Sequence, residues 1–253
     1  MPPPLSLLVD LLPRTGASLL YALGYGTGVG AFALMARRRG LSTPGVWSLV
    51  VVGLLGGLLG ANLAQYLATG APGKSVLGGV TGGYLSVFLY KRYIGLRRPT
   101  GDLFAVGMMA GEAVGRWGCF LGGCCFGRPV AAGSSAAWCV EAQGACRYPA
   151  QIYLSLVCAA ILAVLVAVEA RRALPENGLF FLQGALYAAA RFVIEFYRTA
   201  DPVGLGLTVA QWTCLVAVAF FGTGLWRLVA RERVRVAAPE AVPAPAMAAE
   251  AGG

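Results

Sequence analysis

The sequence contains no histidine, and only 12% of its 253 residues are charged. Without imidazole nitrogens, zinc is a weaker explanation for the cluster of Cys119, Cys124 and Cys125, three of its seven cysteines. Charge is scarce because apolar residues dominate: 58% are hydrophobic, and the mean hydropathy is +0.70. This composition excludes an ordinary soluble globular domain and indicates an integral membrane protein.

The sequence also lacks the short alternating segments of a membrane-spanning β-barrel, and it has long apolar runs instead. A helix needs about 20 residues to cross the hydrocarbon core. Seven stretches approach that length, at about residues 16–36, 45–69, 75–94, 103–123, 150–170, 178–198 and 207–227. The predicted fold class is therefore all-α, a polytopic membrane protein with seven transmembrane helices.

The basic residues predict the orientation, because positive charge accumulates in cytoplasmic loops. If the seven helices alternate, thirteen basic residues fall on one side: Arg37, Arg38, Arg39, Lys91, Arg92, Arg97, Arg98, Arg171, Arg172, Arg227, Arg231, Arg233 and Arg235. Five fall on the other: Arg14, Lys74, Arg128, Arg147 and Arg198. The N-terminus is therefore predicted outside and the C-terminus in the cytoplasm. This placement explains the net charge of +9 without a nucleic-acid partner.

No repeat with a period of 20 to 50 residues is evident, so residues 1–236 are expected to form one helical domain. Residues 237–253 are rich in Ala, Pro and Glu, and we expect a disordered cytoplasmic tail. The first residues lack a basic region and a small-residue cleavage site, so we expect mature sequence there. Glycines spaced four apart predict close helix contacts, at Gly53 and Gly57, Gly56 and Gly60, Gly78 and Gly82, and Gly79 and Gly83.

The stretch GRWGCFLGGCC, residues 115–125, places an arginine and three cysteines at the end of an apolar helix. Cys119, Cys124 and Cys125 contain no CxxC pair, and no metal site is predicted there. They either fill space or take part in thiol chemistry, including a relay of electrons to a quinone.

The other cysteines have simpler explanations. Cys139 and Cys146 lie in the predicted external loop, where an oxidising compartment permits a disulfide. Cys158 and Cys214 fall in mid-span and are expected to be small buried apolar residues.

Two further arginines, Arg116 and Arg191, fall inside predicted spans. Each lies roughly 20 Å from the cytoplasmic start of its helix, so both reach the outer half of the bilayer. An intramembrane charge is costly and is a functional hypothesis by default. The alternative is an internal ion pair at i, i+4 spacing, with Glu112 for Arg116 and with Glu195 for Arg191. Two planar, permanently charged guanidinium groups at one depth favour binding of a phospholipid phosphate. Other polar side chains expected at this depth are Tyr21, Gln151 and Tyr153.

The stretch GRWGCFLGGCCFG, residues 115–127, resembles the signature of the prolipoprotein diacylglyceryl transferases, which runs Gly-Arg-x-Gly-Asn-Phe, then Asn-x-Glu and a closing glycine. Four more stretches are similar to family motifs and keep their chain order: YALGYGTG at 21–28, SVLGGVTGG at 75–83, YPAQIYL at 148–154 and ARFVIEFYRTAD at 190–201. The resemblance covers nearly all of the predicted membrane part.

The resemblance implies a seven-helix enzyme of the bacterial inner membrane with an external N-terminus. Members of the family move the diacylglyceryl group of phosphatidylglycerol onto the lipobox cysteine thiol of a prolipoprotein, in lipoprotein biosynthesis. We therefore expect phosphatidylglycerol, other membrane lipids and a prolipoprotein signal peptide with its lipobox cysteine as partners, with no cofactor. The implied catalytic residues are Arg116, Arg191, Glu195 and Tyr21. The implied substrate-binding residues are Arg116, Arg191, Gly127, Gln151, Tyr153 and Asp102.

The sequence departs from the family pattern at several polar positions. Leu77 stands where the family has an intramembrane histidine. The signature's two asparagines and its glutamate correspond to Cys119, Gly122 and Cys124, and a further His and Glu correspond to Tyr148 and Leu154. The proton of the acceptor thiol is then expected to pass to Glu195, to water or to a cysteine. Two alternatives remain open: a catalytically silent lipid-binding homologue, and a membrane thiol oxidoreductase that uses the cysteine cluster.

Overall fold

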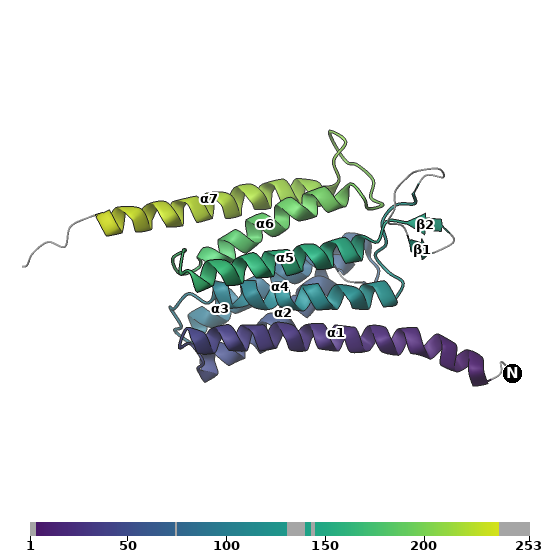
Figure 1. Ribbon diagram of the computed structural model, residues 1–253, viewed down its shortest axis with the longest axis horizontal. Coiled ribbons are helices and arrows are strands. Elements are labelled where there is room, and N and C mark those ends of the chain that lie inside the picture. The colour runs from purple at the N-terminus through teal and green to yellow at the C-terminus, as the bar shows by residue number, and fades with distance from the viewer. Residues whose placement is uncertain (1–3, 74, 131–139, 143–144, 238–253) are drawn as a thin grey trace, which may run out of the picture.

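The computed structural model describes residues 4–73, 75–130, 140–142 and 145–237. Within these ranges the chain forms seven helices and one short hairpin (Figure 1). The helices are α1 (Pro4–Arg38), α2 (Pro44–Thr69), α3 (Val76–Tyr93), α4 (Gly101–Leu121), α5 (Ala150–Ala170), α6 (Gly178–Glu195) and α7 (Val209–Ala237). The strands are β1 (Val140–Ala142) and β2 (Ala145–Arg147), paired antiparallel. Each predicted span corresponds to one helix, whereas the hairpin was not predicted.

Five helices contain a segment long and apolar enough to cross a membrane, which makes the chain a multi-pass membrane protein. The segments are Thr15–Arg38, Pro44–Leu67, Ala150–Ala170, Gly178–Glu195 and Val209–Arg235. The other two predicted spans are α3 and α4. Helix α4 is less apolar because Asp102, Glu112 and Arg116 all lie on it.

Helix α4 is central to the packing. It contacts α1, α5 and α6, while α2 pairs with α3, and α6 also packs against α5 and α7. Figure 1 shows α1 and α7 on opposite sides of the bundle with α4, α5 and α6 between them. The hairpin lies at the end of the bundle where α1 begins. Buried apolar side chains of α1, α4 and α5 form the core, among them Phe32, Met109 and Leu165.

The closest contacts between helices are made at glycines. The four-residue spacing of glycines predicted such contacts for α2 and α3. A Cβ added to Gly60 would lie 2.8 Å from the Cα of Gly82 on α3, too close for any side chain. A second glycine contact, which was not predicted, joins α1 to α4. There, a Cβ on Gly24 would lie 2.9 Å from the Cα of Gly115. Small residues thus bring both helix pairs together.

A buried polar cluster ties four helices together at the end of the bundle opposite the hairpin. The Asp102 carboxylate, which is 2% exposed, accepts hydrogen bonds of 2.9 Å from the backbone amides of Asn177 and Phe180. Arg39 donates to Asp102 at 2.6 Å and, through Nε, to Glu169 at 2.9 Å. Asp102 thereby satisfies amides at the start of α6 that have no partner within that helix.

Candidate active site

Arg116 points from α4 with its guanidinium fixed by an acid on the same helix. Its Nε and Nη2 atoms each lie 2.7 Å from Oε2 of Glu112. The two residues are four apart, so their side chains lie on one face of the helix. The internal ion pair that the spacing predicted is present. It uses two of the five N–H donors of the guanidinium, which leaves the others for a ligand.

Arg191 has a corresponding arrangement on α6. It forms an ion pair with Glu195, whose side chain is only 4% exposed. Nε of Arg198 lies 3.6 Å from the same carboxylate oxygen. The buried Glu195 charge is therefore compensated by two guanidinium groups.

Tyr187 lies close enough to both arginines to interact with their charges. It lies on α6, one turn before Arg191, and its side chain interacts electrostatically with both Arg116 and Arg191. Helices α4 and α6 pack against each other, which brings residues distant in sequence into one region. Sequence reasoning missed Tyr187, although its spacing of four from Arg191 was a usable signal.

The three signature cysteines gather next to Tyr21 of α1. The Tyr21 hydroxyl lies 3.4 Å from the sulfur of Cys119 and 3.9 Å from that of Cys124. The sulfur atoms of Cys119, Cys124 and Cys125 all lie within 4.8 Å of one another. The structure thus groups all three cysteines with Tyr21.

The backbone after α4 explains why the cysteines meet. Gly123 and Cys125 adopt positive φ angles of 67° and 63°, which turn the chain back on the last turn of the helix. The amide of Cys124 donates to the Cys119 carbonyl at 3.1 Å. A hydrogen bond from the Cys119 thiol, helped by the charge of Arg198, lowers the pKa of Cys125 to about 7 against the opposing effect of burial.

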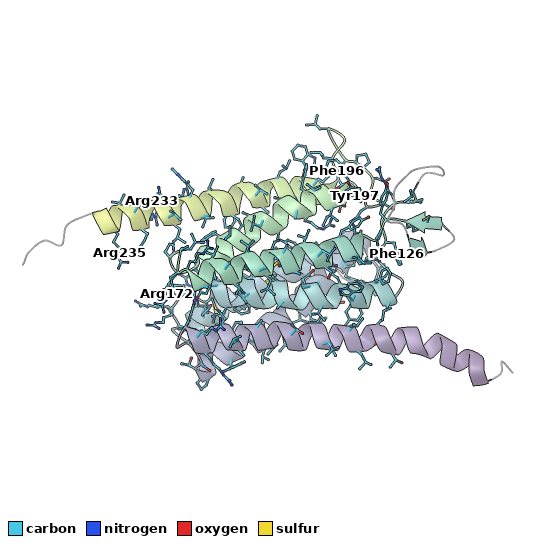
Figure 2. The ribbon with its side chains drawn as sticks, in the orientation of Figure 1. Phe126, Arg172, Phe196, Tyr197, Arg233 and Arg235 are labelled. Carbon is cyan, nitrogen blue, oxygen red and sulfur yellow. The ribbon has the colours of Figure 1, made fainter. Side chains whose placement is uncertain are left out.

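Gln151 and Tyr153 begin α5 beside this cluster. Gln151 is 2% exposed, and its amide nitrogen donates to the Cys124 carbonyl. Within the described part of the chain, the Oε1 atom of Gln151 accepts no hydrogen bond. The Tyr153 ring packs edge-on against Tyr197, with 5.9 Å between centroids. Figure 2 shows Phe126 and Tyr197 at this end of the bundle.

Gly127 holds the loop after α4 against two other segments. Its amide donates to the Tyr148 carbonyl at 2.8 Å, and the next amide, of Arg128, donates to the Tyr197 carbonyl at 2.8 Å. A Cβ on Gly127 would collide with the Tyr197 carbonyl oxygen and lie 2.9 Å from that of Tyr148. Only glycine fits this close approach of three backbones.

Asp102, also predicted to bind substrate, lies apart from these residues. It is fourteen residues before Arg116 on α4, about 21 Å away along the helix axis, in the buried cluster with Arg39. The structure does not bring it to the arginines.

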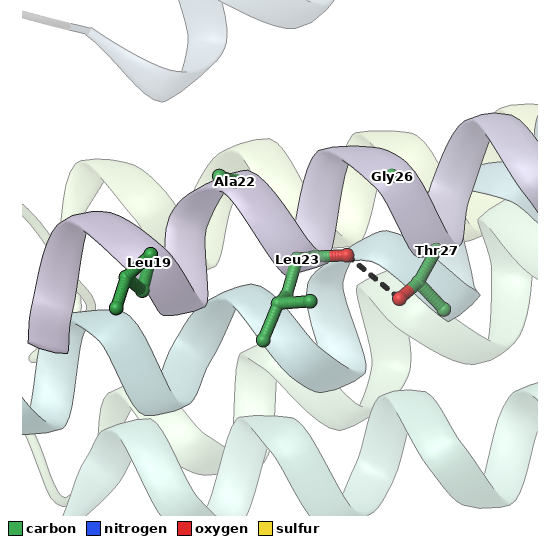
Figure 3. Close-up of a pocket in the computed structure, with 5 residues that line it drawn as sticks. All are labelled: Leu19, Ala22, Leu23, Gly26 and Thr27. Carbon is green, nitrogen blue, oxygen red and sulfur yellow. Dashed lines mark hydrogen bonds between the residues drawn. The ribbon is translucent and has the colours of Figure 1, made fainter.

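A shallow apolar groove runs along the outer face of α1 (Figure 3). The residues that line it are Leu19, Ala22, Leu23, Gly26 and Thr27. The Thr27 hydroxyl donates to the Leu23 carbonyl at 2.7 Å, so it is satisfied within the helix. This groove contains none of the predicted site residues.

Comparison with known proteins identifies the family. A family model described as prolipoprotein diacylglyceryl transferase matches residues 17–227, most of the chain. The chain belongs to the prolipoprotein diacylglyceryl transferase family. The match includes Tyr21, both arginines and the cysteine cluster.

Several relatives carry the name phosphatidylglycerol–prolipoprotein diacylglyceryl transferase. The Aromatoleum aromaticum protein is 30% identical over 251 residues, 88% of this chain and 93% of the relative. The Azoarcus protein is 30% identical over 266 residues, 92% and 97% respectively. A Dehalococcoides mccartyi protein is 32% identical over 154 residues, and this chain spans 58% of that relative's length.

The departures from the diacylglyceryl transferase motifs have different surroundings. Leu154, where the motif that begins α5 has a glutamate, is buried in the apolar core. Cys124, where the signature has a glutamate, is exposed beside Tyr21. Leu77 stands at the position of the family histidine, and its side chain lies outside the described residues.

The five cysteines at 119, 124, 125, 158 and 214 are free thiols. Cys146 is disulfide-bonded, and its expected partner Cys139 lies outside the described residues.

Proposed function

We propose that this protein transfers the diacylglyceryl group of phosphatidylglycerol to the lipobox cysteine thiol of prolipoproteins. The observation that carries the proposal is the pair of guanidinium groups, Arg116 from α4 and Arg191 from α6, each of which interacts electrostatically with Tyr187. The names of the relatives support the same reaction.

In this reaction the acceptor sulfur forms a bond to the glyceryl carbon while the bond from that carbon to the phosphate oxygen breaks. The electron pair of the broken bond leaves with glycerol phosphate, so negative charge on the leaving group increases in the transition state. Arg116 and Arg191 are proposed to bind this phosphate and to stabilise that charge. Glu112 and Glu195 hold the two guanidinium groups in place, which avoids reorganisation during the reaction.

The remaining predicted residues are proposed to shape the outer end of the site. Tyr21 is proposed to orient the reacting thiol, since its hydroxyl lies among sulfur atoms. Gln151 has a buried acceptor oxygen available for a substrate donor. Gly127 and Tyr153 are proposed to form the wall that contacts the lipid headgroup. Asp102 is proposed to act at a distance, by fixing the start of α6.

We further propose that all seven helices cross the inner membrane of a bacterium, with the N-terminus outside and the C-terminus in the cytoplasm. The positive-inside rule supports this orientation, because Arg172, Arg233 and Arg235 lie at the end of the molecule opposite Phe126 and Tyr197 (Figure 2). The disulfide of Cys146 fits an external loop. Residues 1–236 are proposed as the membrane domain. The proposed tail, 237–253, lies outside the described residues except for Ala237, which ends α7.

Two other functions have a specific observation in their favour. The burial of Leu154 and the absence of histidine favour a silent homologue that binds phosphatidylglycerol without transferring it. The three sulfur atoms within 4.8 Å favour a thiol oxidoreductase.

The deciding experiment incubates purified protein in vesicles with phosphatidylglycerol labelled in its acyl chains and with a lipobox peptide. The proposal predicts label on the peptide, lost in the Arg116→Ala and Arg191→Ala variants. Arg97→Ala, which removes an exposed arginine at the far end of the bundle, is the matched control. Saturable lipid binding with no labelled peptide would establish the silent homologue instead. Quinone-dependent oxidation of Cys119, Cys124 or Cys125, detected by thiol trapping, would establish the oxidoreductase.

A further inference from the structure

Three thiols converge at the outer end of α4 although their spacing contains no CxxC pair. Cys119, Cys124 and Cys125 are all free, and their sulfur atoms lie within 4.8 Å of one another. Cys119 is on the rigid last turn of α4, and the other two lie on the turn that folds back against it. Cys124 and Cys125 are exposed, so a small ion or an acceptor thiol can reach them.

This arrangement matches the ligand set of a thiophilic d10 cation. A Zn²⁺ ion with Zn–S bonds of about 2.3 Å separates its sulfur ligands by roughly 3.8 Å in a tetrahedron. Sulfur pairs within 4.8 Å therefore need to close by at most about 1 Å, a movement that the exposed loop residues Cys124 and Cys125 can supply. Thiolates are soft ligands, and they select Zn²⁺ or Cu⁺ over hard cations such as Mg²⁺.

The surrounding charges suit such a site. Three thiolates around one Zn²⁺ carry a net charge of −1. Two cations are in position to offset it, since Arg116 interacts electrostatically with Cys119 and Arg198 interacts with Cys125. The Tyr21 hydroxyl, 3.4 Å from the Cys119 sulfur, adds a hydrogen-bonding group at the edge of the site.

We propose that Cys119, Cys124 and Cys125 bind a thiophilic d10 cation such as Zn²⁺, with the fourth coordination position open to the acceptor thiol. The proposal rests on the transfer function above and assigns a way to activate its nucleophile. A zinc site with three protein ligands and one open position is the arrangement of catalytic zinc. A thiol that coordinates the ion is deprotonated, and its proton passes to water.

Each bond in the proposed step is accounted for without oxidation or reduction. The metal-bound acceptor thiolate attacks the glyceryl carbon, a carbon–sulfur bond forms, and the carbon–oxygen bond to the phosphate breaks. Glycerol phosphate leaves with the electron pair, and the new thioether is a weaker ligand that dissociates from the ion. The cation would thereby promote deprotonation of the acceptor thiol. In the family, the histidine at the position of Leu77 could serve as the base for this step.

The first test measures metal binding by the metal-free, full-length protein in detergent, with the disulfide of Cys146 intact. Cd²⁺ is the probe, because cadmium–thiolate bonds give a charge-transfer absorption band in the ultraviolet. The proposal predicts saturation at one ion per chain and at least tenfold weaker binding in Cys119→Ser, Cys124→Ser and Cys125→Ser. Cys214→Ser, which removes a buried thiol in α7, is the matched control and binds as the wild type does. Absent binding, or binding that survives all three cluster replacements, overturns the proposal.

The second test separates this proposal from the transfer function. Labelled peptide is measured with the Zn²⁺-loaded protein and after removal of the ion by a chelator. The proposal predicts at least a tenfold fall on chelation and recovery when Zn²⁺ is returned. If transfer depends on Arg116 but its rate does not change on chelation, the metal site is refuted and the proposed transferase function stands. Stoichiometric Cd²⁺ binding with no transfer in any state refutes the transferase and the activation step, while the cation site itself stands.

Discussion

The hydroxyl of Tyr21 on α1 lies 3.4 Å from the sulfur of Cys119 on α4, and it joins the first helix of the bundle to the signature segment. This contact depends on the glycine packing between the same helices, because the Tyr21 ring lies 3.0 Å from where a Cβ on Gly118 would be. The thiol cluster is therefore held by two helices that are far apart in sequence.

Replacement of Tyr21 by phenylalanine tests the contribution of this hydroxyl. The ring and its packing stay, while a hydrogen bond worth about 0.5–1.5 kcal/mol is lost, so transfer should fall by about two- to tenfold. The rate of peptide labelling measures the effect. Tyr25→Phe, on the exposed face of the same helix, is the control and should keep the wild-type rate. Equal rates for all three proteins would show that the Tyr21 hydroxyl has no part in the reaction.

Replacement of Asp102 by asparagine should destabilise the fold without weakening lipid binding. The change removes the charge that faces Arg39 and weakens the acceptor for two amides at the start of α6. Arg39 keeps its pairing with Glu169, so we expect the cost of a lost hydrogen bond to a charged group, about 1.5–3 kcal/mol. Thermal unfolding in detergent should show a lower midpoint than for the wild type. Phosphatidylglycerol affinity, measured per folded molecule, should be unchanged. A selective loss of affinity with normal stability would instead establish the direct substrate contact that the family resemblance implies.

A single methyl group at Gly127 should disrupt the end of the site nearest the hairpin. The added Cβ of Gly127→Ala would collide with the Tyr197 carbonyl, so the loop must move away from the segment that follows α6. We expect a destabilisation of about 1–3 kcal/mol, as for overpacking in other tightly packed regions, together with reduced transfer. Gly204→Ala is the control, since nothing lies within 4 Å of its added Cβ. If both variants unfold and react like the wild type, the close approach at Gly127 is not required.

The number of helices in the described residues could be predicted because a long run of apolar residues is a strong local signal. The ends of two helices could not be predicted in this way. Helix α1 begins at Pro4 and α7 continues to Ala237, beyond the apolar runs, because a helix does not have to stop where the hydrocarbon ends. The hairpin of β1 and β2 was missed because strands of three residues carry too little pattern to recognise.

The site was predictable in part, for reasons that differ between residues. The ion pairs of Arg116 and Arg191 follow from four-residue spacing within one helix. The grouping of Cys125 with Cys119 depends on two positive φ angles, which the sequence hints at only through its glycines. The hydrogen bonds of Asp102 to the start of α6 join segments 75 and 78 residues apart, and no local pattern encodes such a contact.

The central claim is that Arg116 and Arg191 bind one lipid phosphate together. It is tested most directly by the affinity of headgroup-labelled phosphatidylglycerol for the wild type, Arg116→Ala, Arg191→Ala and the double variant. Each single variant should bind at least about tenfold more weakly, a loss of about 1.4 kcal/mol, in keeping with a charge-assisted hydrogen bond. The fold-loss of affinity in the double variant should differ from the product of the fold-losses in the two single variants. Residues that bind one shared partner are energetically coupled. Wild-type affinity in either single variant, or losses that multiply, would contradict the account.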